Sequence, residues 1–222
     1  MVGSAHVVDT SGPVRERLSG QRLQAIALEL DPERVAVLAE GPDAARSRPR
    51  SGPVFIRLWG VLQRRLGQQL GQGAGAEMRS GARLAREWNL PVFLIDDPFR
   101  ETVRRLLSSL RPDERVRLLL GALLGLVVPS RTVKRELQHY TEAPGDYLAG
   151  IREQFPSVAR VLLDDRNEHM ADRLKAIWNQ GYHRVAVVVG DAHVAGLSEA
   201  LRRRELPVVA IEFRELQPPK AP

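Results

Sequence analysis

The sequence predicts an α/β fold in which a mostly parallel central sheet is flanked by helices, with a helical cap or insert beside it. Three observations lead to this class. Short apolar runs recur along the chain, their apolarity is continuous rather than alternating, and helix-like segments fill the spaces between them. Continuous apolar runs are typical of strands buried on both faces, as in parallel sheets. Alternation of strands with helices is the pattern of α/β folds.

Four apolar runs are predicted to be strands, because each contains Val or Ile and is bounded by Pro, Asp or Gly. They are residues 26–30 (IALEL), 92–95 (VFLI), 185–189 (VAVVV) and 208–213 (VVAIEF). A further strand is expected just before Gly3, where only Met1 and Val2 precede, so it must be very short or incomplete. The sheet is thus expected to take strands from both ends of the chain.

Helical periodicity fills the intervals between these runs. The clearest segments are residues 76–88, 166–178 and 197–206. The second is expected to begin after Asp164 or Asp165 as N-cap. Residues 102–162 lack a strand signal and are rich in Leu and Arg, which predicts a wholly helical insert.

The domain organisation follows from these segments. We expect a single α/β domain over residues 1–216, with the helical insert inside it, and a disordered tail over residues 217–222. Residues 40–53 and 67–75 are rich in Pro or Gly and are predicted to be loops.

The net charge of +6 comes almost entirely from arginine. The arginines are scattered over helical stretches and interleaved with Glu and Asp, and few aromatic residues accompany the densest runs, residues 46–50 and 202–204. Solvated helix faces explain this pattern better than a nucleic-acid site, which would add aromatic residues for base stacking. Nucleic acid is therefore not an expected partner.

The chain has no cysteine, which excludes disulfides, thiolate metal ligands and a cysteine nucleophile. No secretory signal follows Met1, and no uncharged apolar stretch reaches the ~18–20 residues of a membrane-spanning helix. The longest candidate, residues 118–128, is too short and follows Arg117. These features predict a soluble, cytoplasmic protein with no transmembrane segment in this chain.

The pentapeptide Gly-x-Ala-His-Val occurs twice, at residues 3–7 and 190–194, although the chain has only five histidines. The second copy directly follows a predicted strand, and ligands of open α/β sheets collect outside the carboxyl ends of strands. Glycine at that point lets the backbone turn sharply. We therefore expect His6 and His193 to project together over one edge of the sheet. The alternative is that both are inert histidines, hydrogen-bonded at strand ends.

Glu29 stands near the carboxyl end of an apolar run and is followed by Asp31 and Arg34. A buried carboxylate is costly unless a cation or a hydrogen-bond donor neutralises it. The two histidines, a metal that they hold, or an arginine such as Arg34 could do so. Glu29 is therefore a candidate member of the same site.

Arg166 is expected in the first turn of its helix, from which its side chain could reach an anion or Glu29. The alternative is that it simply pairs with a nearby carboxylate. The other three histidines, His139, His169 and His183, lack a comparable setting and are expected at the surface.

Five motifs follow one another between Val2 and about Leu201: GSAHV, ALELDPER, LGQGAGAEM, DDRNEHMA and VVGDAHVAG. This ordered set resembles the TraB family, named for a pheromone-shutdown protein and related to the Tiki proteases and, more distantly, to the erythromycin-esterase and ChaN-like proteins. The resemblance implies an α/β fold whose site combines two Gly-x-x-His turns with a strand glutamate. In this chain those residues are His6, His193 and Glu29.

The resemblance also implies supporting residues at positions that match the family's motifs. They are Arg166, Asn167, Glu77, Asp96, Arg104 and Arg105. Relatives often carry Arg after the aspartate that corresponds to Asp96, where this chain has Asp97. Some relatives also carry membrane helices after this domain, so membrane association occurs among them.

These residues predict a metal-dependent hydrolase, of the peptidase type that the resemblance implies. His6 and His193 would bind a divalent ion, with Glu29 as third ligand or general base and a position left open for water. The ion would lower the pKa of that water to about 7, and Arg166 would stabilise the oxyanion or bind a substrate carboxylate. Mn, Co and Zn all suit these ligands, and the expected substrate is a peptide or a small molecule.

Two alternatives need no metal catalysis. A histidine with Glu29 as base or orienting group could hydrolyse esters, as the erythromycin-esterase relatives suggest. Two facing histidines could instead ligate haem in a non-catalytic binding protein, as the ChaN-like relatives suggest. The sequence leaves the natural substrate and the oligomeric state open, a homo-oligomer included.

Overall fold

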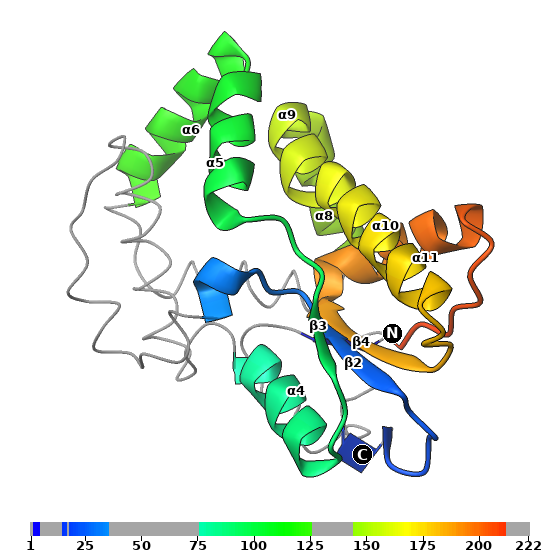
Figure 1. Ribbon diagram of the computed structural model, residues 1–222. Helices are drawn as coiled ribbons and strands as arrows, with labels where there is room; N and C mark the ends of the chain where they lie inside the picture. Colours follow the sequence, from blue (N-terminus) through cyan, green and yellow to red (C-terminus); the bar gives the residue numbers. More distant parts are fainter. Residues whose placement is uncertain (1, 5–14, 17, 36–75, 126–143, 212–222) are drawn as a thin grey trace, which may run out of the picture.

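The computed structural model describes residues 2–4, 15–16, 18–35, 76–125 and 144–211 (Figure 1). Their centre is a four-stranded parallel sheet in the order β1-β4-β2-β3. The strands are β1 (Val2–Ser4), β2 (Ala25–Leu28), β3 (Val92–Leu94) and β4 (Val185–Gly190). The α/β class and the parallel sheet predicted from the continuous apolar runs are confirmed. The predicted loops and the tail lie outside the described residues.

The pairing register brings the carboxyl ends of the strands to one edge of the sheet. Leu28 of β2 pairs with Leu94 of β3 and with Val188 of β4, and Ser4 of β1 pairs with Gly190 of β4. Because every pair is parallel, the residues that follow these positions emerge at the same edge. The first strand of the chain therefore ends beside the last one.

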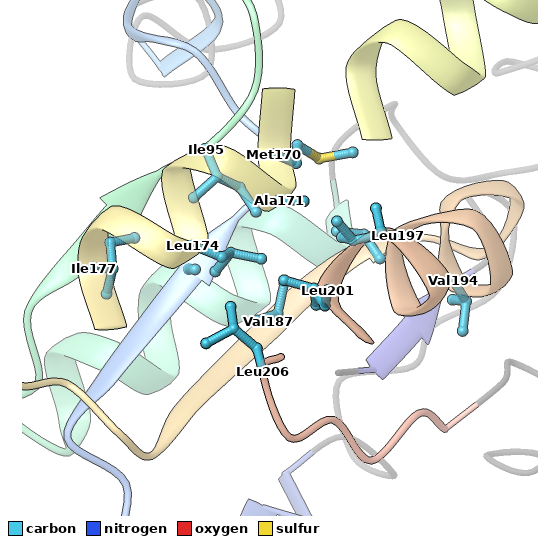
Figure 2. Packing of buried hydrophobic residues seen from close by; sticks show 13 residues of the cluster. Ile95, Met170, Ala171, Leu174, Ile177, Val187, Val194, Leu197, Leu201 and Leu206 are labelled. Carbon is cyan, nitrogen blue, oxygen red and sulfur yellow. The ribbon is translucent and has the colours of Figure 1, made fainter. Parts of the chain in front are cut away.

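Helices cover both faces of this sheet. In Figure 1, α4 (Ala76–Glu87) lies on one face, and α10 (Asp165–Asn179) and α11 (Asp191–Arg203) lie on the other. Residues alternate along the strands accordingly: Ile26 and Leu28 pack with α4, whereas Ala27 packs with α10 and α11. In Figure 2, leucines from α10 and α11 converge with Leu206 on Val187 of β4.

The described chain between β3 and β4 is helical apart from short connections, as predicted for the insert. It comprises α5 (Phe99–Ser109), α6 (Pro112–Gly125), α8 (Pro144–Gln154), α9 (Pro156–Ala159) and the π-helical segment η1 (Arg160–Asp164), followed by α10. In Figure 1, α5, α6 and α9 lie beyond the carboxyl ends of the strands. Within the described ranges, no helix is long and apolar enough to span a membrane.

Two local predictions are wrong. The run at residues 208–213 is not a strand in its described part, where only Ile211 forms an isolated bridge, and Val209 is 77% exposed rather than buried. Asp164 is not the N-cap of α10, because α9, η1 and α10 form one continuous helix and Asp164 is itself helical. Its carboxylate instead pairs with Arg152, at 2.6 and 2.8 Å.

Glu114, in the first turn of α6, ties two helix N-termini together. Its fully buried carboxylate accepts the backbone N–H of Arg111 at 2.9 Å and that of Ser157, at the start of α9, at 2.7 Å. Burial opposes the carboxylate charge, but these hydrogen bonds and the Arg111 charge outweigh it and lower the pKa of Glu114 below its ordinary value. Glu114 therefore stabilises the helical region in its charged form.

Glu114→Gln is expected to lower the free energy of unfolding at pH 7 by about 1–3 kcal/mol, because a charged acceptor of two buried N–H groups is lost. The folded-state pKa of Glu114 lies below the unfolded value of about 4.3. Its contribution is therefore complete above that value and is lost as the pH falls through the folded-state pKa.

Urea denaturation at pH 7 and at low pH measures this difference, which should shrink under acid conditions. Glu153→Gln, at an exposed position of α8, is the matched control. Equal stabilities of Glu114→Gln and wild type at pH 7 would contradict the assignment.

Candidate functional site

Buried carboxylates gather where β2 and β3 end. β2 is followed by Glu29 and Asp31, and β3 by Asp96 and Asp97, and none of the four is more than 8% exposed. Carboxylates buried together at one edge are costly to desolvate and repel one another unless cations neutralise them. Three arginines from other elements contact this group: Arg34, Arg105 and Arg166.

Arg166, on α10, joins the ends of β2 and β3. Its Nε donates to Asp96 Oδ1 at 2.9 Å and its Nη2 to Asp96 Oδ2 at 2.8 Å, while Nη2 also donates to Glu29 Oε1. Nη1 donates to the Leu162 carbonyl at 3.2 Å. The expected contact between Arg166 and Glu29 is therefore present, with Asp96 as a second partner. Arg34 bonds Asp96, at 3.2 Å.

The charge of Arg166 is fixed by these partners. Burial opposes a positive charge on its guanidinium, but the charges of Glu29 and Asp96 and their hydrogen bonds outweigh burial and raise the pKa of Arg166 above its ordinary value. Arg166 therefore stays charged at every physiological pH. At this site it holds carboxylates in place and transfers no proton.

The second Gly-x-x-His motif forms a direct strand-to-helix junction. β4 ends at Gly190 and α11 begins at Asp191, so His193 lies in the first turn of α11, 4% exposed. Its Nε2 lies 3.4 Å from Glu29 Oε1, and the N–H of Gly190 donates to Glu29 Oε2 at 2.6 Å. The motif therefore contacts both carboxylate oxygens of Glu29.

Asn167, next to Arg166 on α10, holds the other side of the His193 ring. Its Oδ1 lies 2.8 Å from His193 Nδ1, and both side chains are buried. The Arg-Asn pair thus contacts the predicted glutamate with one residue and the predicted histidine with the next. The structure brings together Glu29, Asp96, Arg166, Asn167 and His193.

Asp31 supports this group through the backbone. Its Oδ1 accepts the N–H groups of Glu33 at 2.8 Å and of Arg34 at 3.1 Å, which caps a helical turn at residues 32–35. This turn carries Arg34, whose guanidinium reaches Asp96. Within the described part of the chain, the buried Asp31 Oδ2 has no hydrogen-bond partner.

Asp97 is the centre of a neighbouring cluster of contacts that was not predicted from the sequence. Arg105 of α5 donates to Asp97 Oδ2, and His169 Nδ1 lies 3.2 Å from Asp97 Oδ1. The His169 side chain is 36% exposed, so it lies at the surface as expected, but it has a carboxylate partner that was not expected. Arg104, in contrast, is 77% exposed and pairs with Glu101 at 2.6 Å.

The sequence did contain a signal for this cluster. His169 stands three residues after Arg166, and residues at this spacing share one helix face. Asp97 follows Asp96 directly at the end of β3. Two consecutive acidic residues facing two basic residues of one helix face predict two neighbouring pairs.

Two predicted residues lie outside what the structure describes: His6 and the side chain of Glu77, which belongs to the first turn of α4. His6 follows Ser4 by two positions, and Ser4 is the register partner of Gly190. Within the described ranges, no three His, Asp or Glu side chains are grouped closely enough to hold a metal ion. The predicted metal set of His6, His193 and Glu29 includes one residue beyond those ranges.

The chain is similar to an uncharacterized protein of Methanocaldococcus jannaschii, with 25% identity over 213 residues. The match covers 92% of the chain and 53% of that protein, so the chain spans about half the length of this relative. No solved structure matches the chain. Residues 1–208 match the TraB/PrgY/gumN family, in agreement with the resemblance carried by the Gly-x-x-His, glutamate and Arg-Asn motifs. The chain therefore belongs to the TraB/PrgY/gumN family.

Proposed function

We propose that the protein is a hydrolase of the peptidase type that depends on a divalent metal ion. The observation that carries this proposal is the buried pair of His193 Nε2 and Glu29 Oε1, 3.4 Å apart. Asn167 contacts the other ring nitrogen and the Gly190 N–H contacts the other carboxylate oxygen. An imidazole nitrogen and a carboxylate oxygen therefore face each other at the sheet edge where α/β proteins bind ligands.

The donor chemistry of this pair fits Zn, Co or Mn. A metal-ligating histidine usually has its second nitrogen held by a hydrogen bond, as Asn167 holds Nδ1 here. The Glu29 carboxylate can supply an oxygen ligand beside this histidine nitrogen. We assign His6 as the third ligand, because it stands in the other copy of the motif and follows the strand that pairs with β4.

Each residue of the site has a separate role in the proposed reaction. A bound ion would supply Lewis acidity and so make water a nucleophile at neutral pH. Glu29 would serve as a ligand to the ion or as a base that accepts a proton from water. Arg166 holds Glu29 in place and is itself held by the bidentate bond to Asp96. The substrate is a peptide or a small molecule with an amide or ester bond.

Protein purified without a histidine tag is expected to carry about one divalent ion, as a three-ligand catalytic site does. A chelator should abolish activity in a peptidase and esterase screen, and Zn, Co or Mn should restore it. Elemental analysis of His193→Ala and Glu29→Gln should show reduced metal. His183→Ala, at an exposed position, is the control. Metal-free protein with chelator-resistant activity would contradict the metal dependence.

A metal-independent hydrolase is the second candidate. It is favoured by the hydrogen bonds that Arg166 and the Gly190 N–H donate to Glu29, which fix the carboxylate next to His193. A Glu–His pair held in this way could orient and deprotonate a water molecule without an ion. Chelator-resistant hydrolysis that is lost in Glu29→Gln would favour it. A Soret band on haem titration that is lost in His193→Ala would instead favour a haem-binding protein.

A further inference from the structure

The contact of α10 with α11 at Gly196 determines how His193 is held. Gly196 lies one helical turn after His193, and Asn167 of α10 packs against both. A Cβ at position 196 would lie 3.3 Å from Asn167 Cγ and still closer to Asn167 Nδ2. Glycine inside a helix is otherwise unfavourable. Its presence here is explained by the amide of Asn167, which fills the space that a side chain would take.

The hydrogen bond made from this position defines where the proton sits on His193. Asn167 Oδ1 lies 2.8 Å from His193 Nδ1, and the two side chains are 3% and 4% exposed. An amide oxygen can only accept, so Nδ1 carries the hydrogen. A neutral imidazole then has its lone pair on Nε2, 3.4 Å from Glu29 Oε1, where two acceptors repel each other unless an ion or a proton lies between them.

We propose that Asn167, seated on Gly196, is a positioning residue that sets the tautomer and the ring orientation of His193. Its importance for catalysis rests on the proposed function, because the Nε2 lone pair is what would bind an ion or take up a proton. The tautomer itself does not depend on that function. Gly196 is required for this arrangement, since the side chain of any other residue would displace the Asn167 amide.

Gly196→Ala is the most informative variant. The new methyl group meets first the end of the Asn167 side chain, which can swing away while the backbone stays in place. We therefore expect Gly196→Ala to fold like wild type but to lose the bond to His193. Asn167→Ala removes the same bond from the other side and replaces Gly196→Ala if that variant does not fold. Gly150→Ala, on α8, where a Cβ meets nothing within 4 Å, is the matched control.

The first measurement is the tautomer of His193 in the metal-free protein. Long-range 1H–15N NMR spectra at alkaline pH distinguish the two tautomers, and the signals of His193 are those missing in His193→Gln. We expect the Nδ1–H form in wild type and in Gly150→Ala, and a mixture in Gly196→Ala and Asn167→Ala. A wild type in the Nε2–H form, or a Gly196→Ala spectrum like that of wild type, would overturn the proposal.

The second measurement is the affinity for Zn²⁺. Loss of a residue that orients a metal ligand typically costs 10–100-fold in affinity, and we expect this loss in each single variant. The double variant should bind no more weakly than either single one, because both changes remove one contact. If the affinity loss of the double variant equalled the product of the two single losses, Gly196 and Asn167 would not act through one contact. If the wild-type protein binds no Zn²⁺, that result contradicts the proposed metal-dependent function but not the role of Asn167. The role of Asn167 is then tested by the tautomer measurement.

Discussion

Replacing Arg166 by methionine is expected to lower the free energy of unfolding by about 3–5 kcal/mol, the range found when one partner of a buried ion pair is removed. Methionine keeps much of the side-chain volume but leaves Glu29 and Asp96 without the cation that they share. Their side chains are only 6% and 3% exposed, so water cannot replace it. Urea denaturation at pH 7 measures the loss.

Arg203→Met is the matched control for this experiment. Arg203 also contacts two carboxylates, those of Glu168 and Glu199, but its side chain is 52% exposed. Exposed pairs of this kind contribute at most about 1 kcal/mol. Adding Asp96→Asn to Arg166→Met should recover part of the loss, because one unpaired charge is then removed. Similar losses for Arg166→Met and Arg203→Met would show that the carboxylates do not depend on Arg166.

If the protein is a hydrolase as proposed, Glu29→Gln is expected to lower its rate by at least about 100-fold, the contribution of a positioned general base. The fold should persist, because the amide oxygen of glutamine can still accept from Arg166 or from the Gly190 N–H. His193→Ala and His6→Ala are expected to abolish activity in the same screen. Rates are to be measured at saturating substrate, so that the loss reports on the chemical step.

Glu33→Gln provides the comparison for Glu29→Gln. Glu33 stands four residues further along the same segment, with its side chain 48% exposed against Arg100. We expect wild-type rates for this variant. Thermal unfolding of both variants separates loss of chemistry from loss of structure. A Glu29→Gln variant as active as wild type would remove Glu29 from the reaction.

The strands could be predicted where burial on both faces imposes continuous apolarity. β2 and β4 are buried between α4 on one face and α10 and α11 on the other, and their sequences are continuously apolar. β3 lies at the edge of the sheet and is only partly buried, with Val92 41% exposed, although its sequence is also apolar. The run at residues 208–213 has the same composition, yet Val209 is 77% exposed. Local composition does not distinguish residues 208–213 from the runs that form strands. Burial of an apolar run depends on which distant segments pack against it.

Most of the side chains that meet at the strand ends could be predicted from the sequence, but which of them contact each other could be predicted only in part. Glu29 and His193 could be recognised because each stands where a strand ends, and ligand sites form at such ends. The choice of Arg105 over Arg104 as partner of Asp97 was not predictable. Adjacent residues of a helix point about 100° apart, and the direction that α5 takes after β3 is set by tertiary packing.

The π-helical segment η1 has a consequence for how insertions and deletions would act. Its N–H···O bond from Asp165 to Arg160 encloses one residue more than an α-helical turn. Deleting one residue there would restore regular helix, because the wider turn takes up its extra residue locally. The helix on either side would keep its direction, so α8 and α9 would stay in place relative to α10. Homologues one residue shorter at this point are therefore expected to keep both the contacts of Arg166 with Glu29 and Asp96 and the placement of the helices before η1.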